Sequence, residues 1–170
     1  EYSCRAHLRL APRTLQKKST LLNPQFKKER REPSKEALTK AYAHYAMGAL
    51  RDQENRFREA VREFERAVAY DKSSSAIHTR LGAGYIKLRQ FDKAIEELKA
   101  AQALDPADER PRTLLALLYI SLRRFPEAIQ EYEEALKQNP QEARILFSLA
   151  DLYVVQGHLE KAASLYHTLI

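Results

Sequence analysis

The chain has 170 residues, of which 44% are hydrophobic and 31% charged, enough for a packed core beneath a solvated surface. Its four glycines, seven prolines and single cysteine exclude a collagen-like chain, a low-complexity chain and a disulfide-stapled domain. The net charge of +6 comes from residues 1–33, which contain nine Lys or Arg and three Glu, whereas residues 34–170 contain 20 basic and 20 acidic residues. Every apolar run is far too short to span a bilayer.

Residues 1–33 are predicted to form a flexible, basic and acid-poor segment. Between Tyr2 and Lys28 there are seven basic residues and no acidic one, and Pro12 and Pro24 interrupt any helix. Two alternatives stay open. Transit peptides are rich in Arg and poor in acidic residues, so the segment is compatible with a targeting remnant. The same charge would also suit an arm that binds phosphate groups.

Residues 34–170 repeat with a period of 34. Small residues recur at this spacing in two series, each accompanied by large apolar residues a few positions away. The two series are Ala60, Ala94, Ala128 and Ala162, and Gly48, Gly82, Ala116 and Ala150. The period divides the array into units of about 41–74, 75–108, 109–142 and 143–170, of which the fourth is truncated.

Each unit is predicted to contain two helices. In the third unit, apolar residues recur every three or four positions over 114–122 and again over 125–136, the spacing of two helical stripes. The polar pair Arg123 and Arg124 separates the stripes, and Pro106 and Pro140 stand at unit boundaries because proline cannot continue a helix. The small residues allow helices to cross closely while large neighbours fill the adjacent grooves. We therefore expect an all-α solenoid of helix–turn–helix units.

This pattern resembles the tetratricopeptide repeat family over residues 41–170. The second unit carries the family's motif as Leu81-Gly82, Tyr85, Ala94, Leu98, Ala101 and Pro106. The resemblance implies a right-handed superhelix whose concave groove, lined by the first helix of each unit, holds a peptide or a partner helix. We expect further repeats or a capping helix after Ile170, because repeat arrays close with a polar outer face. A short native terminus whose final turn frays stays open as the alternative.

The resemblance also implies which residues line the groove. The matching positions include Tyr42, Tyr45, Ala49, Asp52, Thr79, Arg80, Ala83, Lys87, Arg110, Thr113, Leu117, Ile120, Arg144, Phe147 and Asp151. Arginines in such a wall can bind carboxylates while the apolar residues seat apolar side chains. The carboxylate clamp of chaperone-binding members is not expected, because only Arg110 fits the five clamp positions, which also include Tyr45, Ala49, Arg80 and Leu114.

Nothing in the sequence indicates catalysis, a cofactor or a metal site. His44 and His78 lie 34 residues apart, so they are interpreted as packing positions of successive repeats rather than as ligands of one metal ion. The glutamate pairs fall on the polar faces of predicted helices. The sequence contains no phosphate-binding glycine motif and no nucleophile motif.

The predicted function is that of a non-catalytic scaffold or adaptor, with a protein or peptide partner in the groove. Two alternatives stay open: association with an anionic surface or nucleic acid through residues 1–33, with nucleic acid disfavoured as a partner, and self-association through the uncovered end at residues 165–170. No transmembrane segment is expected. A soluble, cytoplasmic protein is the default expectation, or an exported or organellar one if a targeting segment preceded Glu1.

Overall fold

The computed structural model describes residues 33–169, and the predictions made for residues 1–32 lie outside this part. Within it there are eight α-helices and no strand, which confirms the all-α prediction. The helices are α1 (Lys35–Gln53), α2 (Phe57–Tyr70), α3 (Ser75–Lys87), α4 (Phe91–Leu104), α5 (Glu109–Ser121), α6 (Phe125–Gln138), α7 (Ala143–Val155) and α8 (Leu159–Thr168).

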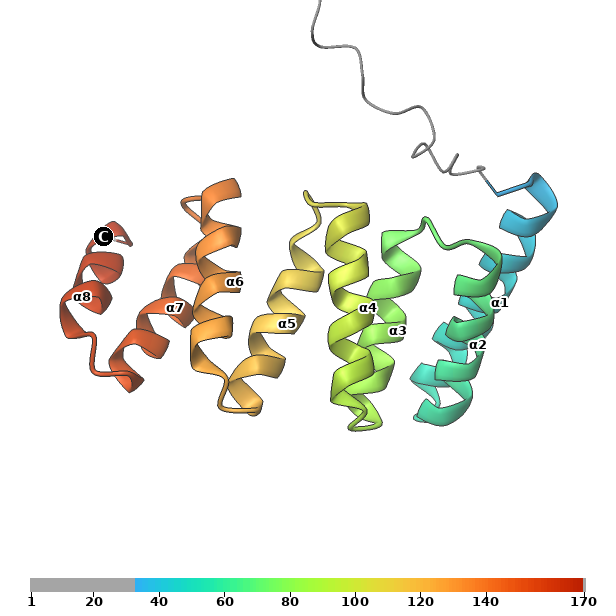
Figure 1. Ribbon diagram of the computed structural model, residues 1–170, viewed down its shortest axis with the longest axis horizontal. Coiled ribbons are helices and arrows are strands. Elements are labelled where there is room, and N and C mark those ends of the chain that lie inside the picture. Colours follow the sequence, from blue (N-terminus) through green and yellow to red (C-terminus); the bar gives the residue numbers. More distant parts are fainter. Residues whose placement is uncertain (1–32, 170) are drawn as a thin grey trace, which may run out of the picture. The chain divides into compact units, whose positions relative to one another are not determined.

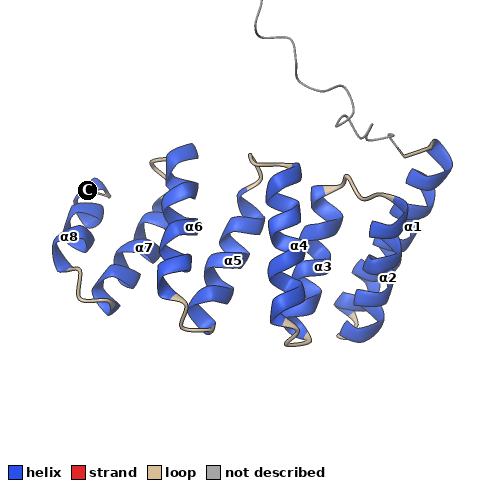
Figure 2. Ribbon diagram, in the orientation of Figure 1, coloured by secondary structure: helices blue, strands red, loops and turns tan. Residues whose placement is uncertain are grey.

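The helices form four pairs in chain order. Each odd-numbered helix packs against the even-numbered helix that follows it, and each even-numbered helix also packs against the next odd-numbered one. In Figure 1, α2 and α4 lie nearer the viewer than α1 and α3. Short loops join all the helices (Figure 2). We call the face that carries the odd-numbered helices the inner face and the face that carries the even-numbered helices the outer face.

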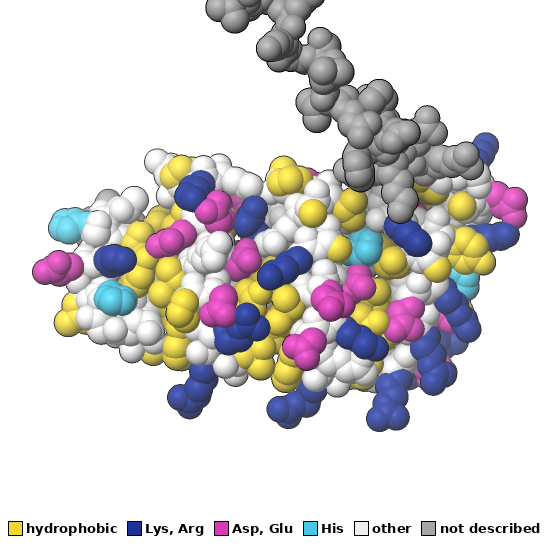
Figure 3. All heavy atoms as spheres, in the orientation of Figure 1, with side chains coloured by type: hydrophobic (Ala, Val, Ile, Leu, Met, Phe, Trp, Pro, Cys, Tyr) yellow, Lys and Arg dark blue, Asp and Glu magenta, His cyan; other side chains and the backbone are white. Residues whose placement is uncertain are grey.

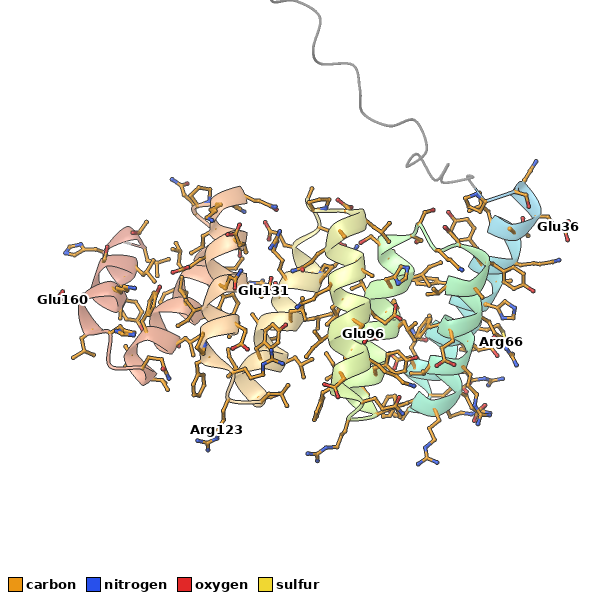
Figure 4. The ribbon with its side chains drawn as sticks, viewed as in Figure 1. Glu36, Arg66, Glu96, Arg123, Glu131 and Glu160 are labelled. Atoms are coloured by element: carbon orange, nitrogen blue, oxygen red, sulfur yellow. The ribbon has the colours of Figure 1, made fainter. Side chains whose placement is uncertain are left out.

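The turn inside each pair uses one left-handed residue. Asn55, Arg89 and Arg123 have φ angles of 59°, 59° and 57°, and Gly157 has 75°. Asn and Gly adopt this conformation readily, whereas in Arg it brings Cβ too close to the following carbonyl oxygen and is destabilising. Figure 4 shows Arg123 projecting away from the helices at this turn. All four turns therefore have one geometry, although only two of them carry a residue suited to it.

The alanines spaced by 34 residues lie where the two helices of a pair cross. Ala60, Ala94 and Ala128 are fully buried, and Ala162 is 2% exposed. The glycine series is equally tight, because a Cβ atom built on Gly48 would lie 2.6 Å from the ring of Phe64. Real Cβ atoms do not approach other atoms so closely, so the ring occupies the space that glycine leaves open. The predicted close-approach points are confirmed.

Tyrosines on odd-numbered helices connect successive pairs. The hydroxyl of Tyr85 on α3 donates to Glu65 on α2 over 2.7 Å, and that of Tyr153 on α7 donates to Glu133 on α6 over 2.5 Å. Burial and the adjacent carboxylate raise the pKa of Tyr153 to about 12, so this hydroxyl stays protonated and keeps donating at neutral pH. These bonds tie the second repeat to the first and the fourth repeat to the third.

The first helix is longer than the repeat period requires. It begins at Lys35, six residues before the predicted start of the first unit at residue 41, and the Ser34 hydroxyl accepts a hydrogen bond from the Ala37 amide as its N-cap.

None of the described helices combines the length and the apolar character needed to cross a membrane.

Candidate functional site: the inner groove

A groove of about 690 Å³ opens on the inner face between α3, α5 and α7. Its floor is apolar and includes Leu114, Leu117 and Ile145, while Thr79, Thr113 and Ser148 add hydroxyl groups. Seven of the predicted groove residues line it, namely Thr79, Arg80, Ala83, Arg110, Thr113, Leu117 and Arg144. The odd-numbered helices bring these side chains together because the period of 34 puts equivalent residues on one face.

A second hollow of about 670 Å³ continues the groove towards the C-terminal ends of α5 and α7. It shares Leu117, Tyr132 and Ser148 with the first hollow and adds the predicted residues Ile120 and Asp151. Its remaining lining is mostly apolar. The two hollows together form what we call the inner groove.

Six predicted residues lie outside both hollows: Tyr42, Tyr45, Ala49, Asp52, Lys87 and Phe147. The Lys87 ammonium is 2.5 Å from the Asp52 carboxylate and 4.8 Å from the centre of the Phe57 ring. The ion pair between Lys87 and Asp52 therefore links the first two repeats. The Tyr45 ring packs against Phe64 with centroids 5.9 Å apart. The inner groove therefore belongs to repeats two to four.

Six further residues line the first hollow. Leu114 and Ser148 also stand at family groove positions, whereas the other four do not: Glu109, Tyr132, Glu142 and Ile145. The sequence pattern gives no signal for Tyr132 as a groove residue, because it lies on α6 and is 2% exposed. Tyr132 lines both hollows together with residues of α5 and α7, so it reaches the groove from the outer layer. Glu109 and Glu142 precede the predicted arginines, and each marks the start of an odd-numbered helix.

The arginines of the inner groove differ in how they are paired. Arg110 donates two hydrogen bonds to Asp108, from Nε to Oδ1 and from Nη2 to Oδ2, each over 2.8 Å. These bonds hold the pKa of the Asp108 carboxyl below its ordinary value, and the carboxylate also caps α5 by accepting from the Arg110 amide. Among residues 33–169, Arg80 and Arg144 are exposed and have no carboxylate within ion-pair distance.

Large apolar side chains stand exposed at the groove and beside it. Leu117 is 53% exposed at the junction of the two hollows, and Phe147 is 51% exposed on α7. The Phe147 ring lies 6.1 Å from that of Tyr166, centre to centre. Such residues supply contact area for an apolar partner, since their burial on binding removes apolar surface from water.

The two repeated histidines pair with glutamates inside their own repeats. Nδ1 of His44 lies 2.7 Å from Glu63, and Nδ1 of His78 lies 2.6 Å from Glu97. The hydrogen bond with Glu97 raises the pKa of His78. Within the described part of the chain, no group of three or more His, Cys, Asp or Glu side chains could hold a metal ion.

Helix pairs stacked at a fixed period, with a groove on the inner face, define a helical-repeat protein. Two family models, both described as tetratricopeptide repeat, match residues 53–118 and 113–169. The chain belongs to the tetratricopeptide repeat family, whose members generally serve as scaffolds for protein–protein interaction rather than as catalysts.

Solved structures with the same fold include MamA, with a TM-score of 0.71, 21% identity and coverage of 76% of this chain and 75% of that one. YrrB, described as a TPR protein with an unusual peptide-binding site, gives 0.65 at 23% identity over 76% and 67%. The TPR domain of OM64 from Arabidopsis gives 0.63 at 16% identity over 68% and 96%. No curated protein sequence matches significantly. At these identities the likeness concerns the fold.

Proposed function

We propose that the chain is a non-catalytic scaffold that holds an extended protein segment in the inner groove. The observation that carries the proposal is the arrangement of Arg80, Arg110 and Arg144, on three successive odd-numbered helices, around a groove of about 690 Å³ with an apolar floor. Convergent cations above apolar surface suit a segment that carries both acidic and apolar side chains.

The two unpaired arginines are the main sites for acidic side chains. A guanidinium group binds a carboxylate through two parallel hydrogen bonds, and Arg80 and Arg144 have no such partner among residues 33–169. The guanidinium group of Arg110 already makes such a pair of hydrogen bonds, with the Asp108 carboxylate. A partner carboxylate at Arg110 would have to displace Asp108, so Arg110 contributes less to affinity than the other two.

The apolar side chains of the partner contact the second half of the groove. Leu117 stands at the junction of the two hollows, and Ile120 lines the second one. Apolar anchors in well-packed pockets carry much of the affinity at protein interfaces, while charges mainly set specificity and association rate. The preferred partner therefore presents acidic residues towards Arg80 and Arg144 and an apolar residue towards Leu117.

Fluorescence anisotropy with a labelled peptide panel tests this function. One peptide set carries two leucines flanked by aspartates, and the matched set carries lysines in place of the aspartates. We expect binding of the acidic set, and the double substitution Arg80→Glu with Arg144→Glu to weaken it by about tenfold or more, as expected for the reversal of two charges at an interface.

The control for charge alone is Lys137→Glu, because Lys137 is an exposed cation on α6 that pairs with Glu134 and lies outside the groove. This variant should bind the acidic peptides as the wild type does. Equal affinity of the wild type and the double variant would remove the two arginines from the mechanism. The roles considered for residues 1–33 and for the C-terminal end stay predictions, and we propose no catalytic role.

A further inference from the structure

The outer faces of α2 and α4 carry opposite charges at equivalent positions. Both helices have 14 residues, and they begin at Phe57 and Phe91, so residues 34 apart stand at the same height along the two helices. Four surface positions are inverted in sign between the helices, and all eight side chains are exposed. The pairs are Arg58 and Asp92, Glu59 and Lys93, Arg62 and Glu96, and Glu65 and Lys99.

The repeat itself does not dictate this inversion. Buried positions of the same two helices keep their character, since Ala60 corresponds to Ala94 and Phe64 to Leu98. On α6, by contrast, the positions equivalent to Arg58 and Arg62 are Pro126 and Gln130, which are uncharged. The change of charge sign at all four positions is thus specific to the surfaces of α2 and α4. Figure 3 shows more basic side chains over α2 and acidic side chains over α4.

The opposite charges do not neutralise each other within the chain. Among the described residues there is no ion pair between α2 and α4, and Arg58, Arg62, Asp92 and Glu96 take part in none at all. A hollow of about 340 Å³, lined by Arg58 and Arg62 on one side and by Lys93 on the other, lies beside the two helices. Figure 4 labels Glu96 on α4. Four charges are therefore available to an outside partner.

We propose that two copies of the chain associate through the outer faces of α2 and α4, about a twofold axis that runs parallel to these helices. Such a rotation lays α2 of one copy over α4 of the other and keeps every height unchanged. Arg58 then faces Asp92 of the second copy, and Arg62 faces Glu96. Because a twofold interface is self-complementary, each contact occurs twice.

The charge pattern selects this axis over the other twofold arrangement of the same faces. An axis perpendicular to the helices, still within the interface, would lay α2 on α2 with the heights reversed, so that Arg58 and Arg62 would not meet Asp92 and Glu96. With that axis midway between residues 58 and 62, Arg58 would face Arg62 of the second copy, and like charges brought together at an interface are costly. The proposed contact uses the outer face and leaves the inner groove free, so it is independent of peptide binding.

Sedimentation velocity of the full chain tests the proposal. The wild type should show a monomer–dimer equilibrium, with a dissociation constant that rises by about tenfold or more between about 0.1 M and about 1 M NaCl, because the Debye length shortens from about 10 Å to about 3 Å. Two charge-reversed variants should each remain monomeric: Arg58→Asp with Arg62→Glu, and Asp92→Arg with Glu96→Arg. In the first variant positions 58, 62, 92 and 96 are all acidic, and in the second all four are basic.

An equimolar mixture of the two variants is the decisive sample. The acidic residues at positions 58 and 62 of the first variant then meet the arginines at positions 92 and 96 of the second. Asp92 and Glu96 of the first variant meet Arg58 and Arg62 of the second. We expect the mixture to dimerise as the wild type does. The control Lys137→Glu alters an exposed cation elsewhere and should leave the wild-type dimer intact.

Several results would overturn the proposal. The wild type would contradict the proposal if it stayed monomeric at every concentration tested at low salt. If the variants then differed only by lower melting temperatures, the charges would act within a single chain. Dimers that persist in both variants would assign association to the C-terminal end or to residues 1–33. If a charge-reversed variant fails to fold by circular dichroism, Arg58→Gln with Arg62→Gln replaces it, and an unchanged dissociation constant in that variant would contradict the proposed contact.

Discussion

Gly82 and Leu98 interlock where α3 crosses α4. A Cβ atom on Gly82 would lie 2.7 Å from Cγ of Leu98, so the leucine occupies the space that the glycine leaves. The equivalent pair in the first repeat, Gly48 and Phe64, has the same relation at 2.6 Å. A small residue and a large one thus form a single packing unit, repeated along the array.

We predict that Gly82→Val destabilises the array by about 1–3 kcal/mol, because the added methyl groups overpack this crossing. Leu98→Ala alone should cost about 2–5 kcal/mol by leaving a cavity. Urea denaturation of the double variant should show a loss smaller than the sum of the two, since the shortened side chain makes room for valine. Strict additivity would contradict the interlocking.

Leu115 and Leu117 lie two residues apart in the sequence and have opposite roles. Leu115 is fully buried, whereas Leu117 is 53% exposed at the inner groove. We expect Leu115→Ala to lower the free energy of unfolding by about 2–5 kcal/mol and Leu117→Ala to change it by less than about 0.5 kcal/mol. In anisotropy measurements Leu117→Ala should nevertheless weaken peptide binding. Wild-type affinity in this variant would show that the partner avoids the junction of the hollows.

The pairing of His78 with Glu97 makes stability depend on pH. The hydrogen bond with Glu97, helped by the Lys72 carbonyl 3.2 Å from Nε2, raises the pKa of His78 above its unfolded value of about 6.5. A raised pKa means that the folded state holds the proton more tightly. The stabilisation is therefore complete below pH of about 6.5 and is lost as the pH rises through the folded pKa.

Melting temperatures across this pH range, for the wild type and for His78→Gln, check the prediction. The advantage of the wild type should be largest at the acidic end and should shrink as the pH rises. A constant difference between the two proteins would show that the contribution of His78 does not depend on its charge.

A substitution at Gly157 tests the energy of the left-handed backbone conformation alone, because an added side chain would meet no neighbouring residue. Its φ is 75°, and a Cβ atom built there would meet nothing within 4 Å. We expect Gly157→Ala to destabilise the array by about 1 kcal/mol through backbone strain alone. Gly157→Asn should cost less, because asparagine tolerates this conformation, as Asn55 does at the first turn. Equal stability of the alanine variant in thermal denaturation would contradict this explanation.

The repeat fold could be predicted from the sequence because its cause is steric and periodic. Alanines at 60, 94, 128 and 162 leave a trace at a fixed spacing, and the helices follow from the apolar stripes between them. The early start of α1 at Lys35 left no such trace, because a helix before the first unit has no counterpart one period later.

The inner groove could be predicted only in outline. Equivalent positions repeat, but the contacts of each side chain depend on its neighbours. Asp52 and Lys87 pair with each other across two repeats, and Arg110 pairs with Asp108 at its own helix start. The residues in these contacts are separated by different distances along the sequence, so a periodic pattern does not predict the contacts. Tyr132 enters the groove from the other layer, which the family positions do not consider.

Chemical-shift mapping of the isotopically labelled chain with the acidic, leucine-containing peptide tests the central claim most directly. We predict that the amides of Thr79, Thr113 and Ser148, one on each of α3, α5 and α7, shift on titration and that the outer surfaces of α2 and α4 do not. Shifts confined to the even-numbered helices, or none at saturating peptide, would contradict binding in the inner groove.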